Sequence, residues 1–374
     1  MAGASDDVRV LGLQMRDFRT YTRAKADVGP GLTVVHGPNG AGKSNLLEAI
    51  YFGCTGRSPR TRNERELVRF GQQAARVSVR IRQGTADHEL SVGFEPGAAK
   101  RMSSDGAPAE RLLDVEHRPL LSVFMPDRLE LLKGAPSVRR AHLDQVVAGF
   151  WPARAADRRA YGQVLVQRNA LLARIRSGAV SRESISTWDL QLARHALALR
   201  ENRTRAVDLL AEPFAARASQ LGLSGDARLE YRPRTRAADE EALIGELRER
   251  LDGDLQRGFS GHGPHRDELA LLRDGRELRV YGSQGEQRIA LLALLLAERS
   301  TLAHERARMP LMLLDDVMSE LDADRRELLA RELSTGGQSV IATTDLAHVP
   351  GGTASTVTRL RVSPGVVLQE ALAA

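Results

Sequence analysis

Hydrophobic and polar residues alternate near the start of the chain, as they do in half-buried β-strands. The alternation predicts two strands within residues 8–35 and a hairpin made of residues 77–82 and 88–95. Residues 43–54 instead have the 3.6-residue spacing of an amphipathic helix. This part of the chain is therefore predicted to be a mixed α/β structure.

The middle of the chain, from about residue 137 to residue 255, has helical spacing and is rich in Arg, Ala and Leu. Breaks between helices are expected at residues 177–178, at Pro213 and at residues 222–225, where Gly, Ser or Pro interrupts the pattern. The apolar positions do not follow a sustained heptad, so a long coiled coil is not expected.

Strands and helices alternate once more after residue 265. Strands are expected at residues 267–275, 276–282, 309–316, 339–345, 357–362 and 366–371, and helices at 286–303 and 323–335. The layout predicts an α/β head built from both ends of the chain, with a mainly helical arm inserted between them. We assign residues 8–120 to the N-terminal lobe of the head, 121–260 to the arm and 261–374 to the C-terminal lobe.

Composition narrows the class of protein. The chain has 374 residues, of which 42% are hydrophobic and 27% are charged, and these values are typical of a globular protein of two or three domains. The single cysteine, Cys54, excludes a disulfide scaffold and a multi-cysteine metal site. The longest apolar run, near residues 289–297, is too short to span a bilayer, and the N-terminus lacks an apolar signal region. We therefore expect a cytoplasmic protein without a membrane partner.

Positive charge is concentrated in the middle of the chain. The formal net charge is +6, while residues 154–205 alone carry eleven basic and four acidic side chains. Such a segment is typical of a polyanion-binding site, although a solvated Arg-rich surface is the commoner explanation. A content of 4% aromatic residues argues against base stacking and favours contacts to a duplex backbone.

A second, smaller run of arginines extends from Arg57 to Arg69 and continues with Arg76, Arg80 and Arg82. The candidate DNA-binding residues are taken from this run and from the basic middle segment. They are Arg57, Arg60, Arg62, Arg65, Arg154, Arg158 and Arg159.

Residues 37–44, GPNGAGKS, match the phosphate-loop pattern G-x-x-x-x-G-K-[ST] between a predicted strand and a predicted helix. Glycines allow backbone N–H groups to approach phosphates, and the helix N-terminus adds positive potential. Lys43, one of only four lysines, would neutralise the β- and γ-phosphates, and Ser44 would bind Mg²⁺. The expected ATP contacts are Gly37, Pro38, Asn39, Gly40, Ala41, Gly42, Lys43, Ser44 and Asn45.

The apolar run at 311–314 ends in two acidic residues, Asp315 and Asp316. In a protein that has a phosphate loop, the first carboxylate is expected to hold Mg²⁺ and the second to act as general base toward the attacking water. Repulsion between adjacent carboxylates would raise the pKa of one of them. The alternative is a pair of aspartates that caps the following turn.

The pentapeptide Ser283-Gln284-Gly285-Glu286-Gln287 has the form S-x-G-x-Q and precedes a predicted helix, where an anion could bind. Because the chain already has one phosphate loop, this turn most simply serves the nucleotide of another subunit. On its own the pattern is more often a helix cap. Asp322, which opens a helix, and Thr344 and Asp345, which end a strand, are further candidates at the sheet edge.

Taken together, these motifs resemble the RecF family of bacterial DNA replication and repair proteins, an ABC-type ATPase related to SMC heads. The similarity extends from about residue 8 to the C-terminus. Besides the motifs above, it includes the segments DFRTY at 17–21, LKGAPSVRRAHLD at 132–144 and GHGPHRDEL at 261–269. Lys43 and Gln287 lie 244 residues apart, whereas a transporter subunit would place these motifs much closer together.

The resemblance implies a protein that binds ATP with Mg²⁺, dimerises head to tail around ATP and hydrolyses it slowly. In the dimer, Ser283, Gln284, Gly285 and Gln287 would contact the ATP of the partner subunit. It implies binding to double-stranded DNA near single-strand gaps or junctions, a role in the SOS response and repair, and RecR-type and RecO-type partners that help to load recombinase.

For individual residues, the resemblance places Arg19 near the nucleotide, Asp322 in the D-loop and Thr344 and Asp345 as sensors. Glu286 stands where relatives often have Gln. Asp127 would belong to a Mg²⁺-sensing loop, or is a turn residue after Pro126. His265, in GPHRDEL, is expected to be structural.

Two other functions remain open from the residues alone. A soluble ABC subunit of a transporter or translation factor would also have both nucleotide motifs, but with a short insert between them. A scaffold in which ATP only joins subunits would not need the pair of aspartates at 315 and 316. DNA-stimulated hydrolysis distinguishes the first alternative from a DNA-binding protein, and the rate of ATP turnover tests the second.

Overall fold

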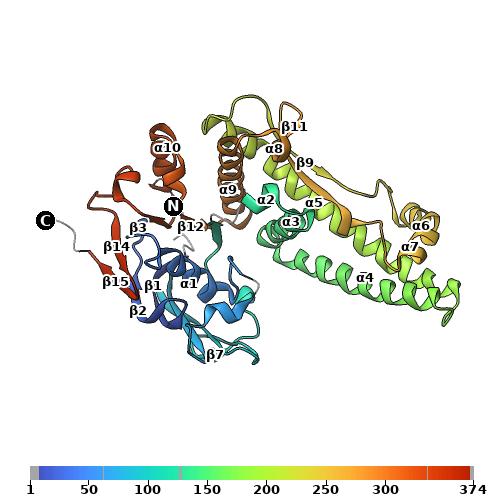
Figure 1. The fold of residues 1–374 in the computed structure, drawn as a ribbon, viewed down its shortest axis with the longest axis horizontal. Helices are drawn as coiled ribbons and strands as arrows, with labels where there is room; N and C mark the ends of the chain where they lie inside the picture. The colour runs from blue at the N-terminus through green and yellow to red at the C-terminus, as the bar shows by residue number, and fades with distance from the viewer. Residues whose placement is uncertain (1–7, 62, 126–128, 335, 371–374) are drawn as a thin grey trace. The chain divides into compact units, whose positions relative to one another are not determined.

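The structure of the chain is a computed structural model that describes residues 8–61, 63–125, 129–334 and 336–370 (Figure 1). The chain divides into two compact units. The head unit combines both ends of the chain, residues 1–128 and 302–374, and the arm unit comprises residues 129–301. Among the described residues, no helix is both long and apolar enough to cross a membrane.

The described residues of the head unit form twelve strands and two complete α-helices. Its strands are β1 (Val8–Phe18), β2 (Tyr21–Asp27), β3 (Leu32–His36), β4 (Ala75–Gln83), β5 (Ala86–Phe94), β6 (Arg101–Ser104), β7 (Ala107–Pro108), β8 (Leu121–Phe124), β12 (Leu311–Asp315), β13 (Ser339–Thr343), β14 (Thr358–Ser363) and β15 (Val366–Gln369). Its helices are α1 (Lys43–Thr55) and α10 (Ala323–Ser334), together with the end of α9 (Gln284–Arg306), which begins in the arm unit.

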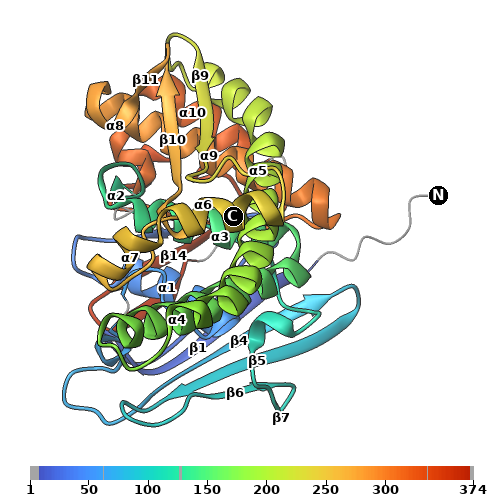
Figure 2. The same ribbon diagram turned by 90° about the vertical axis from the view of Figure 1, so that its right-hand side faces the viewer.

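Two six-stranded sheets form the head unit. The first sheet is antiparallel and has the order β2-β1-β4-β5-β6-β7, and the second has the order β15-β14-β3-β13-β12-β8. Figure 2 shows β1, β4, β5, β6 and β7 of the first sheet. Within the second sheet, β14, β3, β13, β12 and β8 pair in parallel. Helix α1 contacts strands of both sheets, so its apolar residues join their inner faces in one core.

Burial follows the alternation seen in the sequence. Along β4, for example, Val77, Val79 and Ile81 are fully buried, whereas Arg80 and Arg82 are exposed. The central strands β12 and β13 are buried on both faces, as expected of parallel strands covered on two sides. Cys54, at the end of α1, lies in this core, and burial raises the pKa of its thiol to about 12.

The arm unit is mainly helical. Its helices are α2 (Leu129–Lys133), α3 (Pro136–Phe150), α4 (Ala155–Arg176), α5 (Ser186–Gln220), α6 (Glu240–Glu249), α7 (Leu251–Arg257) and α8 (Leu278–Tyr281), followed by the start of α9. A three-stranded sheet of order β11-β10-β9 completes it, with β9 at Ala227–Arg232, β10 at Glu268–Arg273 and β11 at Arg276–Glu277. Apolar side chains of α4, α5 and α6 pack together between the helices.

The expected α/β head with an inserted helical arm is confirmed, and several local expectations are wrong. Strand β2 was missed, and so was β9 in the helical segment. Helix α5 runs through Pro213, where a break was expected. The strand expected at residues 276–282 is limited to β11 at Arg276–Glu277 and is followed by the short helix α8, because Gly282 closes a helical turn onto Leu278.

The end of the arm unit also differs from the expected boundary at residue 260. Strand β10 pairs along its length with β9, from Glu268 opposite Arg232 to Arg273 opposite Ala227. This pairing brings residues 261–301 into the arm unit, so the chain returns to the head unit only at Leu302.

Candidate nucleotide-binding site

The phosphate loop connects β3 to α1, as the sequence predicts. Gly37, Gly40 and Gly42 all have positive φ, between 76° and 154°, a conformation that side chains disfavour. A Cβ atom on Gly37 would lie 2.2 Å from the carbonyl oxygen of Val362, so the loop also packs too closely for a side chain. Pro38, Asn39 and Gly40 are exposed at its tip. The loop therefore has the backbone that phosphate binding requires.

Lys43 lies over this loop with 7% of its surface exposed, and its ammonium donates to the carbonyl oxygens of Gly37 and Pro38 at 2.9 and 3.0 Å. Burial lowers the pKa of Lys43, and the carboxylates of Asp316 and Asp315 oppose this shift. The positive charge of the loop and the paired carboxylates therefore belong to one site.

Asp315 ends β12 and is 4% exposed. Burial raises its pKa above the usual range for aspartate, while a hydrogen bond from the Ser44 hydroxyl acts in the opposite direction. The charge of Asp316 contributes to the raised pKa, but less than burial does. A hydroxyl and a carboxylate that already touch are the protein ligands expected for Mg²⁺ beside ATP, and these two residues fit that ion.

Asp316 has an unusual environment. Its backbone φ is 51°, in the left-handed region. The Asp316 side chain therefore leaves the backbone in a different direction from the side chains of the preceding strand β12. Its side chain makes no capping hydrogen bond, and its buried Oδ1 atom has no hydrogen-bond partner among the described residues. This arrangement does not favour the turn-cap alternative, and it leaves a carboxylate oxygen available to accept a proton.

The order of strands brings these motifs together. β13 lies between β3 and β12, with Thr343 opposite His36 and Ala342 opposite Asp315. The phosphate loop, the end of β13 and the paired aspartates are therefore neighbours at the carboxyl edge of the sheet, where ligands of open α/β sheets bind. Thr344, half-buried, follows β13 directly, and Asp345 caps the next turn by accepting from the Ala347 N–H at 2.9 Å.

Sequence reasoning missed Glu48, which organises one side of the site. It is fully buried on α1 and accepts hydrogen bonds from Arg19 Nε and Nη2, both at 2.8 Å, and from the Ser58 hydroxyl at 2.6 Å. Arg19 is held further by a backbone hydrogen bond to Leu67 and a φ of 51°. A lone acidic residue between Leu47 and Ala49, within an otherwise apolar helix, was the available signal.

Arg60 joins the same cluster. Its Nη1 donates to Asn45 Oδ1 at 2.9 Å and lies 3.3 Å from Glu48 Oε2, and its charge acts on Asp315. Asn45 in turn donates to Thr20 at 3.0 Å. Arg60, although exposed, therefore lies beside the candidate nucleotide site, and its assignment to a DNA-binding surface stays a prediction.

The other candidate DNA-binding residues have mixed surroundings. Arg57, Arg65 and Arg159 are exposed. In contrast, Arg158 pairs with Asp144 at 2.9 Å, and Arg154 stacks on the Trp151 ring and donates to Asn202. Arg62 and Asp127 lie outside the described residues.

The S-x-G-x-Q turn begins α9 in the arm unit, and Ser283, Gln284 and Gly285 are exposed there. Ser283 and Glu286 form a reciprocal capping box: the Ser283 N–H donates to Glu286 Oε2 at 2.8 Å, and the Glu286 N–H donates to the Ser283 hydroxyl at 3.3 Å. Glu286 also pairs with Arg273. The turn therefore caps α9, and these hydrogen bonds hold its exposed residues at the N-terminus of the helix.

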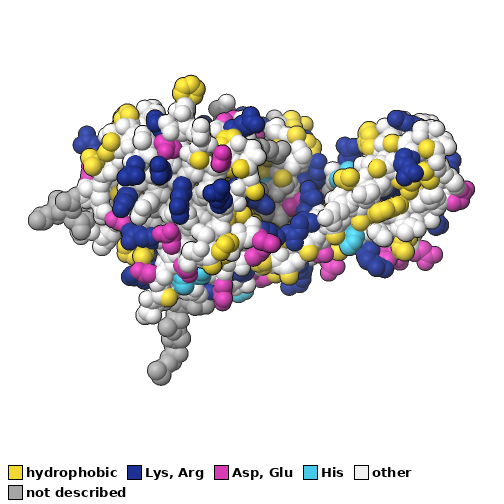
Figure 3. Space-filling model, turned by 90° about the horizontal axis from the view of Figure 1, so that it is seen from below, with side chains coloured by type: hydrophobic (Ala, Val, Ile, Leu, Met, Phe, Trp, Pro, Cys, Tyr) yellow, Lys and Arg dark blue, Asp and Glu magenta, His cyan; other side chains and the backbone are white. Residues whose placement is uncertain are grey.

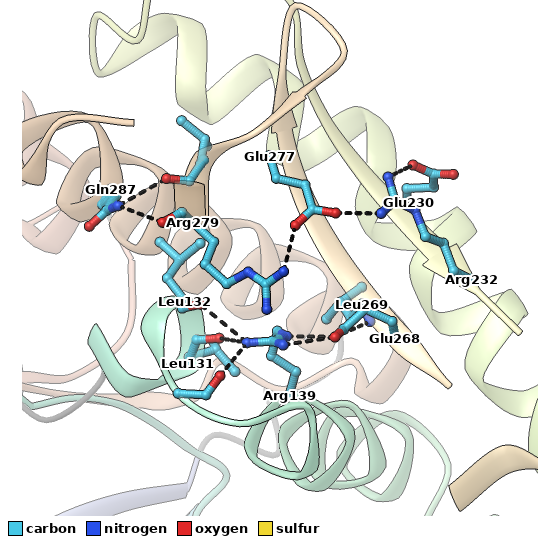
Figure 4. A network of polar contacts seen from close by, with 12 residues as sticks. Leu131, Leu132, Arg139, Glu230, Arg232, Glu268, Leu269, Glu277, Arg279 and Gln287 are labelled. Atoms are coloured by element: carbon cyan, nitrogen blue, oxygen red, sulfur yellow. Dashed lines mark hydrogen bonds and ion pairs between the residues drawn. The ribbon is translucent and has the colours of Figure 1, made fainter. Parts of the chain in front are cut away.

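Gln287 is not exposed with the rest of the turn, which corrects its expected contact with a partner's nucleotide. It is 3% exposed, and its amide donates to the carbonyl oxygens of Leu278 and Gly282 at 2.9 and 3.1 Å. Figure 4 shows the Gln287 amide pointing toward the backbone of Arg279. In this way it attaches α8 to the first turn of α9. Nearby, Glu277 accepts from both Arg232 and Arg279.

The remaining expected residues have clear structural partners. Asp322 caps α10 through the Arg325 N–H at 3.0 Å and pairs with the Arg325 side chain. His265 is half-buried within the arm unit, and its contacts are those expected of a structural histidine. Its Nε2 donates to the Ser260 carbonyl at 2.9 Å, and its Nδ1 accepts from the Tyr161 hydroxyl at 2.6 Å. Burial lowers the pKa of His265, which keeps this tautomer neutral.

A phosphate loop, a buried lysine, paired carboxylates after a parallel strand and a second glycine-containing helix start define an ATPase head of the ABC type. Residues 9–356 match the family model described as the RecF/RecN/SMC N terminal domain. The chain belongs to this family and, within it, to the RecF proteins, as two relatives show.

The DNA replication and repair protein RecF of Myxococcus xanthus (strain DK1622) is 37% identical over 372 residues, which cover 96% of this chain and 97% of the relative. That of Acidothermus cellulolyticus is 38% identical over 342 residues, covering 88% and 92% of the two chains. The fold agrees with a solved structure of the recombination mediator protein RecF with ATP, at a TM-score of 0.87, 27% identity and coverage of 99% and 100%.

Proposed function

We propose that this chain is an ATP-dependent DNA-binding protein of recombinational repair and replication restart. It binds ATP with Mg²⁺, dimerises head to tail around the nucleotide, binds duplex DNA near single-strand gaps or junctions, and helps to load recombinase with RecR-type and RecO-type partners. The observation that carries the proposal is the grouping of Lys43, Ser44, Asp315 and Asp316 at one sheet edge, in a member of the RecF family.

Slow hydrolysis is supported by the two aspartates. Ser44 and Asp315 would hold Mg²⁺, which supplies charge neutralisation at the phosphates. Asp316 would accept the proton of the attacking water through its unpartnered oxygen. Because aspartate is short and Asp316 is held by backbone strain, we expect turnover to be slow, so that ATP acts mainly as a switch.

A head-to-tail dimer is supported by the surface beside the S-x-G-x-Q turn. Val280 and Tyr281, three and two residues before Ser283, are 60% and 64% exposed. They line a hollow of about 720 Å³ together with Arg232, Gly275, Arg276 and Glu277. Since Gln287 links α8 to α9, these two exposed apolar side chains and the exposed turn belong to one continuous surface, which a second copy of the chain would cover in the proposed dimer.

The experiment that tests the proposal is size-exclusion chromatography with and without ATP and gapped duplex DNA, combined with ATP turnover. We expect ATP to shift the wild-type protein to a dimer and DNA to stimulate hydrolysis. Lys43→Met should abolish hydrolysis, whereas Lys43→Arg retains part of the ATP binding because the charge remains. Normal turnover by Lys43→Met would refute the assignment of the loop, and ATP turnover without any response to DNA would favour a soluble ABC subunit of another system.

A further inference from the structure

The outward face of the first sheet carries a line of arginines in direct register. Arg16 of β1 lies opposite Arg23 of β2 on one side and Arg76 of β4 on the other. The line continues across β5 at Gly93, which has no side chain, to Arg101 of β6. Directly opposite residues point to the same face of a sheet, and all four arginines are exposed. We call these four residues the arginine row.

The neighbouring positions on the same face are balanced in charge. Arg80 pairs with Asp27, and Arg82 pairs with Asp87 at 2.7 Å. Among the described residues, the arginine row has no comparable neutralisation. Arg16 approaches one carboxylate, Asp17, at 3.7 Å with its side chain 71% exposed, and Asp17 is shared with Arg69 at 3.3 Å. Arg76 donates to the hydroxyl of Ser91 at 3.1 Å.

Like charges placed directly opposite one another destabilise a sheet, so this arrangement costs stability in the free protein. The cost is removed when a polyanion lies across the row. Strands are spaced by about 4.8 Å, so the row from β2 to β6 is roughly 19 Å wide. A duplex carries one negative charge per about 1.7 Å of its axis, or about eleven phosphates over that width.

We propose that the arginine row is a binding surface for the phosphate backbone of duplex DNA, which rests on the proposed function and specifies where the duplex binds. The next register line of the sheet carries neutral or basic side chains at its accessible positions, Lys25, Gln14, Ser78 and Ser103, while Ser91 in the same line is buried. Neither line contains an aromatic ring, so bases have nothing to stack on. Lysine and arginine side chains gather on the side of the head unit that faces the viewer in Figure 3.

The test compares two double variants of the full-length protein by fluorescence anisotropy with a labelled 30-base-pair duplex and a slowly hydrolysed ATP analogue. Arg16→Gln/Arg76→Gln removes half of the arginine row. Arg80→Gln/Arg82→Gln removes the same number of arginines from the same face, at positions that aspartates already neutralise. We expect at least a tenfold loss of duplex affinity in the first variant and less than threefold in the second. The slope of log affinity against log salt should fall by about two in the first variant only.

Nucleotide binding and ATP-dependent dimerisation are measured in the same samples, and both should remain at the wild-type level. The arginine-row variant should also melt no lower than wild type, because it loses like-charge repulsion. If wild type binds no duplex at all, the proposed function and this inference both fail. If wild type binds duplex and the arginine-row variant binds it equally well, only the inference fails. A variant that loses single-stranded but not duplex binding, or only the binding of an acidic partner protein, also overturns it.

Discussion

Arg19 and Glu48 form a bidentate ion pair at the edge of the phosphate loop, with two hydrogen bonds of 2.8 Å and a carboxylate that is fully buried. Glu48→Gln keeps the shape of the side chain but leaves the arginine charge uncompensated. We expect the free energy of unfolding to fall by about 3 kcal/mol, as for other broken buried pairs. ATP affinity should also fall, by about tenfold, because Arg19 and Arg60 lose their orientation. Urea unfolding and a nucleotide titration measure the two effects.

Glu66→Gln is the matched control. Glu66 lies 3.8 Å from the same arginine but is 49% exposed, so its loss should change stability by less than about 1 kcal/mol. Equal effects of the two substitutions would contradict the role that we assign to Glu48.

Mixing two inactive variants tests whether each ATP is shared between subunits. Each proposed ATP site combines the phosphate loop of one subunit with the S-x-G-x-Q turn of the other. Lys43→Met inactivates the phosphate loop that a subunit contributes, and Ser283→Arg blocks its S-x-G-x-Q turn with a bulky side chain. In a heterodimer, one composite site carries both lesions and the other carries none. With random pairing, half of the dimers are heterodimers, so ATPase activity should recover to roughly a quarter of wild type.

A chain that carries both substitutions is the control, since it should rescue neither parent. Dimer formation with ATP is measured in the same mixture, because strict coupling between the two sites would hide the recovery. Ser283→Arg protein that still dimerises and hydrolyses ATP like wild type would rule out the shared site.

The apolar surface at Val280 and Tyr281 gives a separate prediction about the dimer. Tyr281→Ser should weaken ATP-dependent dimerisation by about 2 kcal/mol, roughly thirtyfold in Kd, because a large apolar side chain is no longer buried at the interface. Sedimentation of an Asp316→Asn background, in which hydrolysis is blocked, measures the Kd directly. Tyr281→Phe keeps the ring and should dimerise normally.

Val166→Ser provides the control on another surface of the arm unit. Val166 is 64% exposed on α4, the same fraction as Tyr281, and its substitution should leave the Kd unchanged. A normal Kd for Tyr281→Ser would exclude this surface from the dimer interface while leaving the Ser283 test intact.

The half-buried His265 predicts a loss of stability in mild acid. Burial lowers its pKa in the folded state, so the unfolded chain binds the extra proton first as the pH falls below about 6.5. Its contribution to stability is therefore complete above that pH and declines toward the lower folded-state pKa. The thermal midpoint of wild type should fall between pH 7 and pH 5 more than that of His265→Gln. Parallel curves for the two proteins would show that His265 does not titrate in this way.

The sequence predicted the parts of the site that depend on local chemistry. The phosphate loop needs glycines and a lysine within eight residues, and the paired aspartates follow a recognisable buried strand, so both could be located without a structure. Their assembly at one edge depends on β13 lying between β3 and β12. That strand order cannot be predicted from the hydrophobic pattern or from the spacing of the motifs along the sequence.

What could not be predicted depends on contacts between distant residues. Arg60 looked like one arginine in a basic run, and only its approach to Glu48 and Asn45 places it beside the candidate nucleotide site. From the sequence, Gln287 was expected to contact the partner's nucleotide, as Ser283 was. In the structure, the first turn of α9 directs its amide toward the backbone carbonyls of Leu278 and Gly282. The register of β1 with β2 and β4, which aligns Arg16 with Arg23 and Arg76, is likewise set by tertiary pairing.

The burial of Cys54 makes this chain convenient for spectroscopy. Its thiol is fully enclosed by the head core and has a pKa of about 12, so at neutral pH it is almost entirely protonated and inaccessible to maleimide reagents. A cysteine introduced at an exposed position away from the S-x-G-x-Q turn, such as Val166, would therefore be the single reactive thiol, without removal of the native one. Dyes attached there could report subunit association by energy transfer in real time, in a protein whose core is left unaltered.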